Sequence, residues 1–324
     1  MSLGRSWYYR QMLSAEVSSR PSYIQFYPTT RCNMSCSFCF NKGLGLSDDM
    51  GANGFGKMVS VLSGEGVASV DMLGGEPTLH REIEDLVGIA LEAGLEVTMS
   101  TNGSRTRTME RLMERFGKAC KLGVSVNSKE VPDDLAGFIR AYKPRIKSLF
   151  REGPELLSMI RMMLSKGVGE YYLIYPDLRH GNREPSTPFR RFHESIAGLR
   201  KSVSEVHPVY CSGFLPDAEA FPELLHTRCA AGVTKLGIMP DGSVYPCNLF
   251  FGNSEFYLGN ILNGRLEDIW GSPKLDFFSQ FKRNGCPVTD CILHSRYHGG
   301  CPALGLEWFG RIDAPDPRCC LTFS

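Results

Sequence analysis

Short apolar runs alternate with longer amphipathic segments between residues 20 and 200 of the chain. Runs rich in aliphatic and aromatic residues predict six β-strands, at residues 23–28, 69–73, 96–100, 122–126, 146–150 and 171–176. Between and after them, apolar residues recur at the period of a helix, which predicts helices at residues 83–91, 109–116, 156–164 and 189–199. Gly94 and Gly167 follow two of these segments, as expected for helix ends.

Strands that alternate with helices of this length predict right-handed βαβ units and a parallel sheet. Six units that curl in one direction would form an α/β fold of the (β/α)6 partial TIM barrel type. A doubly wound open sheet is the competing arrangement, because periodicity does not distinguish the two. In either fold the chemistry belongs at the carboxyl ends of the strands.

The composition changes near residue 205. Beyond it, Pro, Gly and Cys recur in short segments without helical periodicity, and eight of the 12 cysteines lie there. We therefore expect an N-terminal extension at residues 1–20, a barrel at residues 21–204 and a small cysteine-rich domain at residues 205–324. The last region should depend more on metal than on an apolar core.

Charge and hydropathy limit the classes of partner. The 324-residue chain has a formal net charge of +1, which gives no reason to expect nucleic acid or an anionic membrane surface. No apolar run approaches the ~20 residues of a membrane span, and the N-terminus lacks the apolar segment of a secretion signal. We expect a cytoplasmic protein, whose clustered cysteines indicate metal binding or catalysis more than disulfides.

Three cysteines, Cys32, Cys36 and Cys39, follow the first predicted strand at C-x-x-x-C-x-x-C spacing. Thiolates are soft ligands that suit zinc or iron–sulfur clusters, and closed sites of both kinds take four ligands. Three local cysteines leave one metal position open, as a catalytic metal needs for its substrate. The alternative is a closed site in which a distant residue such as Cys120 is the fourth ligand.

This loop resembles the cluster-binding loop of the radical S-adenosylmethionine (SAM) superfamily, in which an aromatic residue, here Phe38, precedes the last cysteine. Gly74, Gly75, Glu76 and Pro77, after the second predicted strand, resemble the GGEP motif of that family. The resemblance implies that a [4Fe–4S] cluster on the three cysteines leaves its fourth iron for SAM. It also implies that the GGEP turn, with the negative charge of Glu76, receives the ammonium group of SAM.

The resemblance implies a reaction as well. One electron from the cluster would cleave SAM to methionine and a 5′-deoxyadenosyl radical, which abstracts a hydrogen atom from an unactivated C–H bond. The cofactor carries the difficult chemistry, and the barrel orients the reactants and excludes water. A flavodoxin- or ferredoxin-type protein would supply the electron.

Polar residues at later strand ends are further candidates for SAM contacts by the same resemblance. Ser100 and Asn102 end the third predicted strand, and Ser125 and Asn127 end the fourth. The last two would hold ribose or carboxylate oxygens, and Arg151, after the fifth strand, would meet the carboxylate of SAM. The alternative for each is an ordinary turn or cap residue.

The cysteine-rich region resembles the SPASM extension, which carries auxiliary iron–sulfur clusters beside a radical SAM barrel. Cys229 is followed by Gly242, four residues and Cys247, and the alternation around Asp241–Gly242 predicts a β-hairpin. The resemblance implies two groups of ligands, namely Cys229, Cys247 and Cys301 for the nearer cluster, and Cys286, Cys291 and Cys319 for the farther one.

The chain departs from the SPASM pattern at Tyr297, which stands where the family has a cysteine. One thiolate is therefore missing, and Asp290, His294 or His298 could replace it, or one cluster could be incomplete or absent. The alternative for the whole region is a zinc ribbon built from the same cysteines.

Two further cysteines are candidate catalytic residues. Cys211 could be a core residue, a cluster ligand or a hydrogen-atom donor of the kind that radical epimerases use. Cys320, next to Cys319, leaves one thiol spare for the same donor role.

We predict a radical SAM enzyme that acts on a peptide or protein, in maturation, cross-linking or epimerisation. A radical SAM dehydrogenase or epimerase of sugars or aminoglycosides is the alternative, and a zinc- or cluster-binding interaction module is the non-enzyme alternative. About twenty residues precede the first strand, so a leader peptide, if used, would need a separate carrier protein or a sheet edge.

Overall fold

The computed structural model describes residues 20–41, 43–45, 48–179, 187–214, 228–279 and 299–319. Its strands are β1 (Tyr23–Phe26), β2 (Ser69–Met72), β3 (Glu96–Thr101), β4 (Cys120–Ser125), β5 (Arg145–Leu149), β6 (Tyr171–Ile174), β7 (Val206–Val209), β8 (Lys235–Ile238), β9 (Ser243–Tyr245) and β10 (Gly259–Asn260). Its helices are α2 (Ala52–Gly64), α3 (Ile83–Glu92), α4 (Thr106–Phe116), α5 (Asp133–Tyr142), α6 (Pro154–Ser165), α7 (Phe189–Ser202), α8 (Leu266–Trp270), α9 (Asp276–Ser279) and α11 (Pro302–Phe309).

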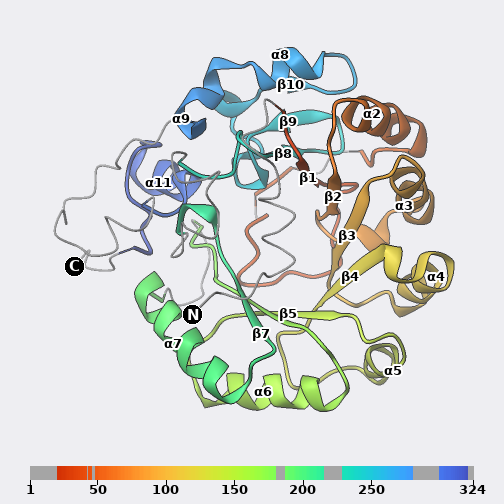
Figure 1. The fold of residues 1–324 in the computed structure, drawn as a ribbon, viewed down its shortest axis with the longest axis vertical. Helices are drawn as coiled ribbons and strands as arrows, with labels where there is room; N and C mark the ends of the chain where they lie inside the picture. Colours follow the sequence, from red (N-terminus) through yellow and green to blue (C-terminus); the bar gives the residue numbers. More distant parts are fainter. Residues whose placement is uncertain are drawn as a thin grey trace.

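All these strands form one sheet, in the order β10-β9-β8-β1-β2-β3-β4-β5-β6-β7. The strands from β1 to β7 are parallel, each paired with the next in sequence. The sheet curves, and the helices from α2 to α7 lie along its outer side (Figure 1). The predicted partial barrel is therefore confirmed, because a doubly wound sheet would carry helices on both faces.

The six predicted strands and four predicted helices are all present, but two helices of the barrel, α2 and α5, were not predicted. The α2 segment contains Gly54 and Gly56, and glycine lowers helix propensity. The α5 segment offers only about two turns of apolar spacing, with Leu135, Ala136, Phe138 and Ile139 buried.

The sheet does not end at the predicted boundary near residue 205. Strand β7 pairs with β6 at one edge, and β8 pairs with β1 in parallel at the other. The β7 sequence, Val-His-Pro-Val, is too short to give a periodic signal, and we had expected irregular structure there. The cysteine-rich region is consequently continuous with the barrel sheet.

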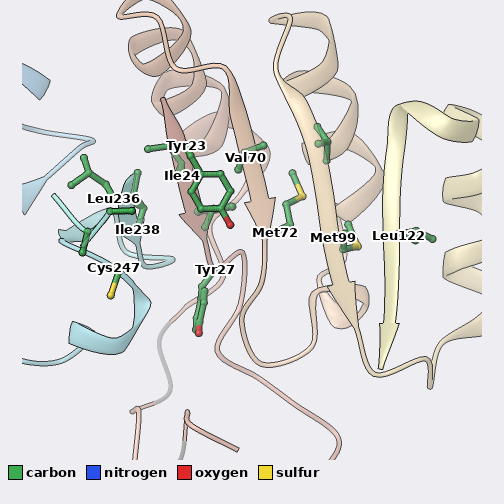
Figure 2. Packing of buried hydrophobic residues seen from close by; sticks show 14 of the residues in the cluster. Tyr23, Ile24, Tyr27, Val70, Met72, Met99, Leu122, Leu236, Ile238 and Cys247 are labelled. Atoms are coloured by element: carbon green, nitrogen blue, oxygen red, sulfur yellow. The ribbon is translucent and has the colours of Figure 1, made fainter. Parts of the chain in front are cut away.

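The core lies along the central strands, and β1, β2 and β8 are buried at every position. Side chains of these strands, such as Ile24, Met72 and Ile238, follow one another across the sheet together with Met99 of β3 (Figure 2). This near-continuous burial is expected of parallel strands that are covered on both faces.

The predicted hairpin is confirmed as the pair β8 and β9, which run antiparallel. Gly242 in the turn has φ +85°, a value that L-amino acids other than glycine rarely adopt, and the Asp241 carboxylate accepts a hydrogen bond of 2.9 Å from the Ser243 N–H. Among the described helices, none has the length and apolar character to cross a membrane.

A buried ion network fixes the C-terminal segment to the end of β6. The Arg318 side chain, 1% exposed, pairs with Asp316 at 2.8 Å and with Asp177 at 3.0 Å. Arg318 also donates to the Pro176 carbonyl oxygen at 2.6 Å, and its guanidinium lies 4.7 Å from the centre of the Tyr175 ring. Asp316 in turn accepts a hydrogen bond of 2.8 Å from the N–H of Cys301.

Replacing Arg318 with Met should lower the free energy of unfolding by about 3–5 kcal/mol, because it leaves buried carboxylates without their partner. Arg311→Met is the matched control, since Arg311 pairs with Asp313 in the same segment but is 67% exposed. Water screens such a pair, so the control should unfold almost like the wild type. Urea unfolding measures both, and equal effects would contradict the assigned role of Arg318.

Candidate iron–sulfur and SAM site

The three-cysteine loop begins just after β1, at the carboxyl edge of the sheet. Cys32 is exposed, and Cys36 and Cys39 are half-buried. Cys120 is buried as the first residue of β4, at the opposite edge of the sheet, and burial raises the pKa of its thiol to about 12. Cys120 therefore cannot close the site, and it packs as an apolar core residue.

The GGEP turn is joined to the cysteine loop by backbone hydrogen bonds. The Gly75 N–H donates to the Thr29 carbonyl oxygen at 3.1 Å, and the Glu76 N–H donates to that of Arg31 at 2.7 Å. A Cβ atom on Gly74 would lie 2.5 Å from the Thr29 oxygen, and one on Gly75 would lie 2.1 Å from the Arg31 oxygen. The two glycines are required because the cysteine loop passes directly against them.

Glu76 is buried and holds the turn to the end of β3. Its Oε1 accepts hydrogen bonds from the Thr78 N–H at 3.1 Å, the Thr78 hydroxyl at 2.5 Å and the Thr101 hydroxyl at 2.7 Å. Its Oε2 accepts one, from the Asn102 N–H at 2.6 Å. Each carboxylate oxygen offers about two acceptor positions, so Oε2, which accepts one hydrogen bond, is the atom with capacity left for an ammonium group.

Asn102 connects β3 to the cysteine loop. Its Nδ2 donates to Asn33 Oδ1 at 2.9 Å and lies 3.9 Å from the Cys32 sulfur. The Met34 N–H also donates to the Cys32 sulfur, at 3.4 Å. Three soft thiol ligands on one accessible loop fit an iron–sulfur cluster.

The other predicted SAM contacts lie along the same edge, but several have protein partners. The Arg151 guanidinium lies 5.5 Å from the centre of the Phe38 ring, so the end of β5 and the cysteine loop meet. Ser100 accepts a hydrogen bond of 2.5 Å from Lys147, and Asn127 accepts one of 2.8 Å from the Leu149 N–H.

The two remaining predicted SAM contacts, Ser125 and Pro77, lie in regular elements. Ser125 is the last residue of β4 and is half-buried, and Pro77 begins a short 3-10 helix, Pro77–Leu79.

Four cysteines of the C-terminal region come together. The Cys211 and Cys301 thiols are hydrogen-bonded to each other, which lowers the pKa of Cys211 to about 7 and raises that of Cys301. Burial, together with the nearby Cys211 and Cys247, raises the pKa of Cys229 to about 12. Sequence reasoning had placed Cys211 outside the two ligand groups.

Close backbone packing brings these cysteines together. The Gly300 N–H donates to the Gly213 carbonyl oxygen at 2.9 Å, and a Cβ atom on Gly213 would lie 2.0 Å from the Gly300 oxygen. The Ala230 N–H donates to the Ser212 hydroxyl at 2.9 Å, which ties in the segment of Cys229. Cys247 packs against β8, where a Cβ atom on Gly237 would lie 2.7 Å from its carbonyl carbon.

Of the remaining predicted cluster ligands, Cys319 alone lies among the described residues. Cys319 is half-buried, and its N–H donates to the Asp316 carbonyl oxygen at 2.9 Å. Several residues lie outside the described part of the chain, namely Cys286, Cys291, Cys320, Tyr297, Asp290, His294 and His298. Within the described part, no three His, Cys, Asp or Glu side chains converge on a point where one metal ion could sit.

Sequence reasoning missed three residues that the site depends on. Lys147 lies within β5 and reaches Ser100, but β5 also contains Arg145 and Ser148, so the lysine does not stand out in the sequence. Arg228 and Asp316 contact the segments that carry the auxiliary cysteines. Nothing local in the sequence distinguishes these two from surface charges.

Two protein-family models match parts of the chain. Residues 26–169 match the model of the radical SAM superfamily. Residues 229–292 match that of the SPASM iron–sulfur cluster-binding domain.

Three curated relatives differ in their substrates. The antilisterial bacteriocin subtilosin biosynthesis protein AlbA of Bacillus subtilis is 25% identical over 89% of this chain and 68% of its own length. PqqA peptide cyclase of Rhodopseudomonas palustris is 22% identical over 95% of this chain and 89% of its own. A probable GTP 3′,8-cyclase of Methanothermobacter marburgensis is 24% identical but covers 68% of this chain and 82% of its own.

Solved structures share the fold. Streptococcus suis SuiB bound to SAM superposes with a TM-score of 0.76 at 19% identity, over 93% of this chain and 77% of that one. SuiB bound to its precursor peptide SuiA gives 0.75 at 19% identity, over 93% and 76% of the two chains.

Gly75→Ala should destabilise the protein by about 1–3 kcal/mol, because the added methyl overlaps the backbone of the cysteine loop. Gly56→Ala is the matched control, since nothing lies within 4 Å of a Cβ atom there and alanine favours the helix. Thermal unfolding of the metal-free protein separates the two. If both variants unfold alike, the loop does not pack on the turn as described.

Glu76→Gln should lower the unfolding free energy of the metal-free protein by about 1–3 kcal/mol, because an amide NH2 would face the Asn102 N–H. It should also weaken SAM binding to the reconstituted protein about tenfold or more. Glu92→Gln on the exposed side of α3 is the control. Weaker SAM binding without any loss of stability would show that Glu76 does not hold the turn to β3.

Proposed function

The chain is a radical SAM protein with a SPASM iron–sulfur cluster-binding region, and we propose that it abstracts a hydrogen atom from a peptide or protein substrate. In this proposal Cys32, Cys36 and Cys39 hold a [4Fe–4S] cluster, and SAM occupies the carboxyl edge of the barrel beside them. The bound cluster and SAM together supply one-electron cleavage to a 5′-deoxyadenosyl radical.

The observation that carries the proposal is the packing of the cysteine loop on the GGEP turn. Because the Gly75 and Glu76 N–H groups are bonded to the loop backbone, the thiols and the turn keep a fixed separation. A ligand that touches both is then oriented before it reacts, which is how a site lowers the entropic cost of reaction. Glu76 Oε2 offers the acceptor for the ammonium, and Arg151, beside Phe38, offers positive charge for a carboxylate.

Several observations support a peptide or protein as the substrate. PqqA peptide cyclase aligns over 95% of the chain, including the cysteine-rich region, and the precursor-bound form of SuiB has the same fold. The GTP cyclase relative aligns over only 68% of it. A sugar or aminoglycoside substrate is the second candidate.

The auxiliary cysteines support a cluster near the barrel. We propose Cys211, Cys229, Cys247 and Cys301 as its four thiolate ligands, since Cys211 and Cys301 are in contact and the other two lie close to Cys211. One thiolate for each iron is the usual ligation of a [4Fe–4S] cluster. A Cys211 thiolate bound to iron has no hydrogen atom to donate, so this assignment replaces its donor role, and Cys320 stays the predicted hydrogen-atom donor.

The farther cluster and the protein partners also stay proposals. Cys286, Cys291 and Cys319 are its proposed ligands, of which only Cys319 lies among the described residues. A flavodoxin- or ferredoxin-type protein is proposed as the electron donor, a separate carrier protein as the means of presenting a leader peptide, and the cytoplasm as the location.

Anaerobically reconstituted protein should convert SAM to 5′-deoxyadenosine when dithionite is added, as measured by liquid chromatography. Changing Cys32, Cys36 and Cys39 together to Ala should abolish this and remove about four irons per chain, while the auxiliary iron stays bound. Cys120→Ala is the control, because that thiol is buried at the opposite edge of the sheet. A triple variant that still forms 5′-deoxyadenosine would refute the assignment.

A further inference from the structure

Arg228 is a fully buried cation at the centre of the cysteine-rich region. Arg228 is 0% exposed. Its backbone N–H donates a hydrogen bond to the Phe278 carbonyl oxygen at 2.9 Å. Its Nη1 donates to the Gly300 carbonyl oxygen at 2.9 Å. Its Nε and Nη2 are buried and have no hydrogen-bond partner within the described ranges. Buried donors of this kind are costly unless something accepts their hydrogens.

Several cysteines lie near this guanidinium. Arg228 directly precedes Cys229, and its bonded carbonyl belongs to the residue before Cys301. Burial lowers the pKa of Arg228, and the nearby Cys229, Cys211, Cys301 and Cys319 raise it. The groups that face Arg228 are therefore thiols from each of the segments that meet there.

Arg318 is a second buried arginine, and its partners differ from those of Arg228. Arg318 is equally buried but is matched by two carboxylates, Asp316 and Asp177, and donates to a backbone oxygen as well. Among the described residues the Arg228 guanidinium has one hydrogen-bond acceptor, the Gly300 carbonyl oxygen. A buried arginine is retained where planar donors meet an anion, and a cluster with four thiolate ligands is an anion.

We propose that Arg228 donates hydrogen bonds through Nε and Nη2 to the sulfurs of the auxiliary cluster and raises its reduction potential. The inference rests on the proposed cluster of Cys211, Cys229, Cys247 and Cys301. Hydrogen bonds to the sulfurs and positive charge both stabilise the reduced cluster, which carries one more negative charge than the oxidised one. Arg228 is a positioning and tuning residue in this scheme and does not touch SAM.

The test is a redox titration of the auxiliary cluster, followed by electron paramagnetic resonance of the reduced state. It uses the full-length chain with Cys32, Cys36 and Cys39 changed to Ala, so that the SAM cluster contributes no signal. Arg228→Met should shift the midpoint potential to a more negative value. At a fixed potential near the midpoint the ratio of reduced to oxidised cluster should fall about tenfold, which corresponds to about 59 mV for one electron.

Two further variants make the result decisive. Arg228→Lys keeps the charge but loses the planar donors, so a smaller shift in the same direction is expected, and Arg311→Met on the surface should cause none. If Arg228→Met does not assemble the cluster, the midpoint potential of Arg228→Lys is the test of the proposal. Iron retained at an unchanged potential overturns the proposal for Arg228. Absence of auxiliary iron from the starting protein overturns the cluster assignment instead, so the two failures are distinguishable.

Discussion

The site depends on one close contact, the packing of the cysteine loop against the Gly74–Pro77 turn. Backbone hydrogen bonds from Gly75 to Thr29 and from Glu76 to Arg31 join two loops that follow neighbouring strands. The contact is possible only because neither glycine has a side chain. Glu76 then ties the turn to Thr101 and Asn102 at the end of β3, so three strand ends become one rigid unit. Rigid support of this kind keeps reacting groups in position.

The C-terminal region is also organised by a close backbone contact between glycines. Gly213 and Gly300 pack backbone to backbone, and this contact brings the Cys211 and Cys301 thiols together. The region is joined to the barrel through β8, which pairs with β1. Asn248 extends the junction, since its N–H donates to Gln25 Oε1 at 3.3 Å and its Nδ2 donates to the Tyr27 hydroxyl at 3.4 Å. Cys247 consequently lies near the end of the strand from which the cysteine loop begins.

The sequence predicted the barrel well because its strands and helices have strong periodicity, as in β3 with α4. The sequence did not predict α2, because its glycines interrupt the helical spacing of apolar residues, nor β7, because four residues are too few to show a period. The cysteine loop and GGEP motif could be found because each is contiguous in sequence. The contact of Gly74 and Gly75 with the cysteine loop is visible only in the structure, because it joins two loops that are far apart in the sequence. The contact of Cys211 with Cys301 joins residues ninety positions apart, so no local pattern reveals it.

Mössbauer spectroscopy of protein reconstituted with ⁵⁷Fe tests the central claim most directly, namely that three local cysteines leave one iron open to SAM. The account predicts that added SAM changes the spectrum of about one iron in four of a single cluster, because the other irons keep their thiolates. The signals of the auxiliary cluster should stay as they were. A spectrum that SAM leaves entirely unchanged, in protein with a full complement of iron, would contradict the account.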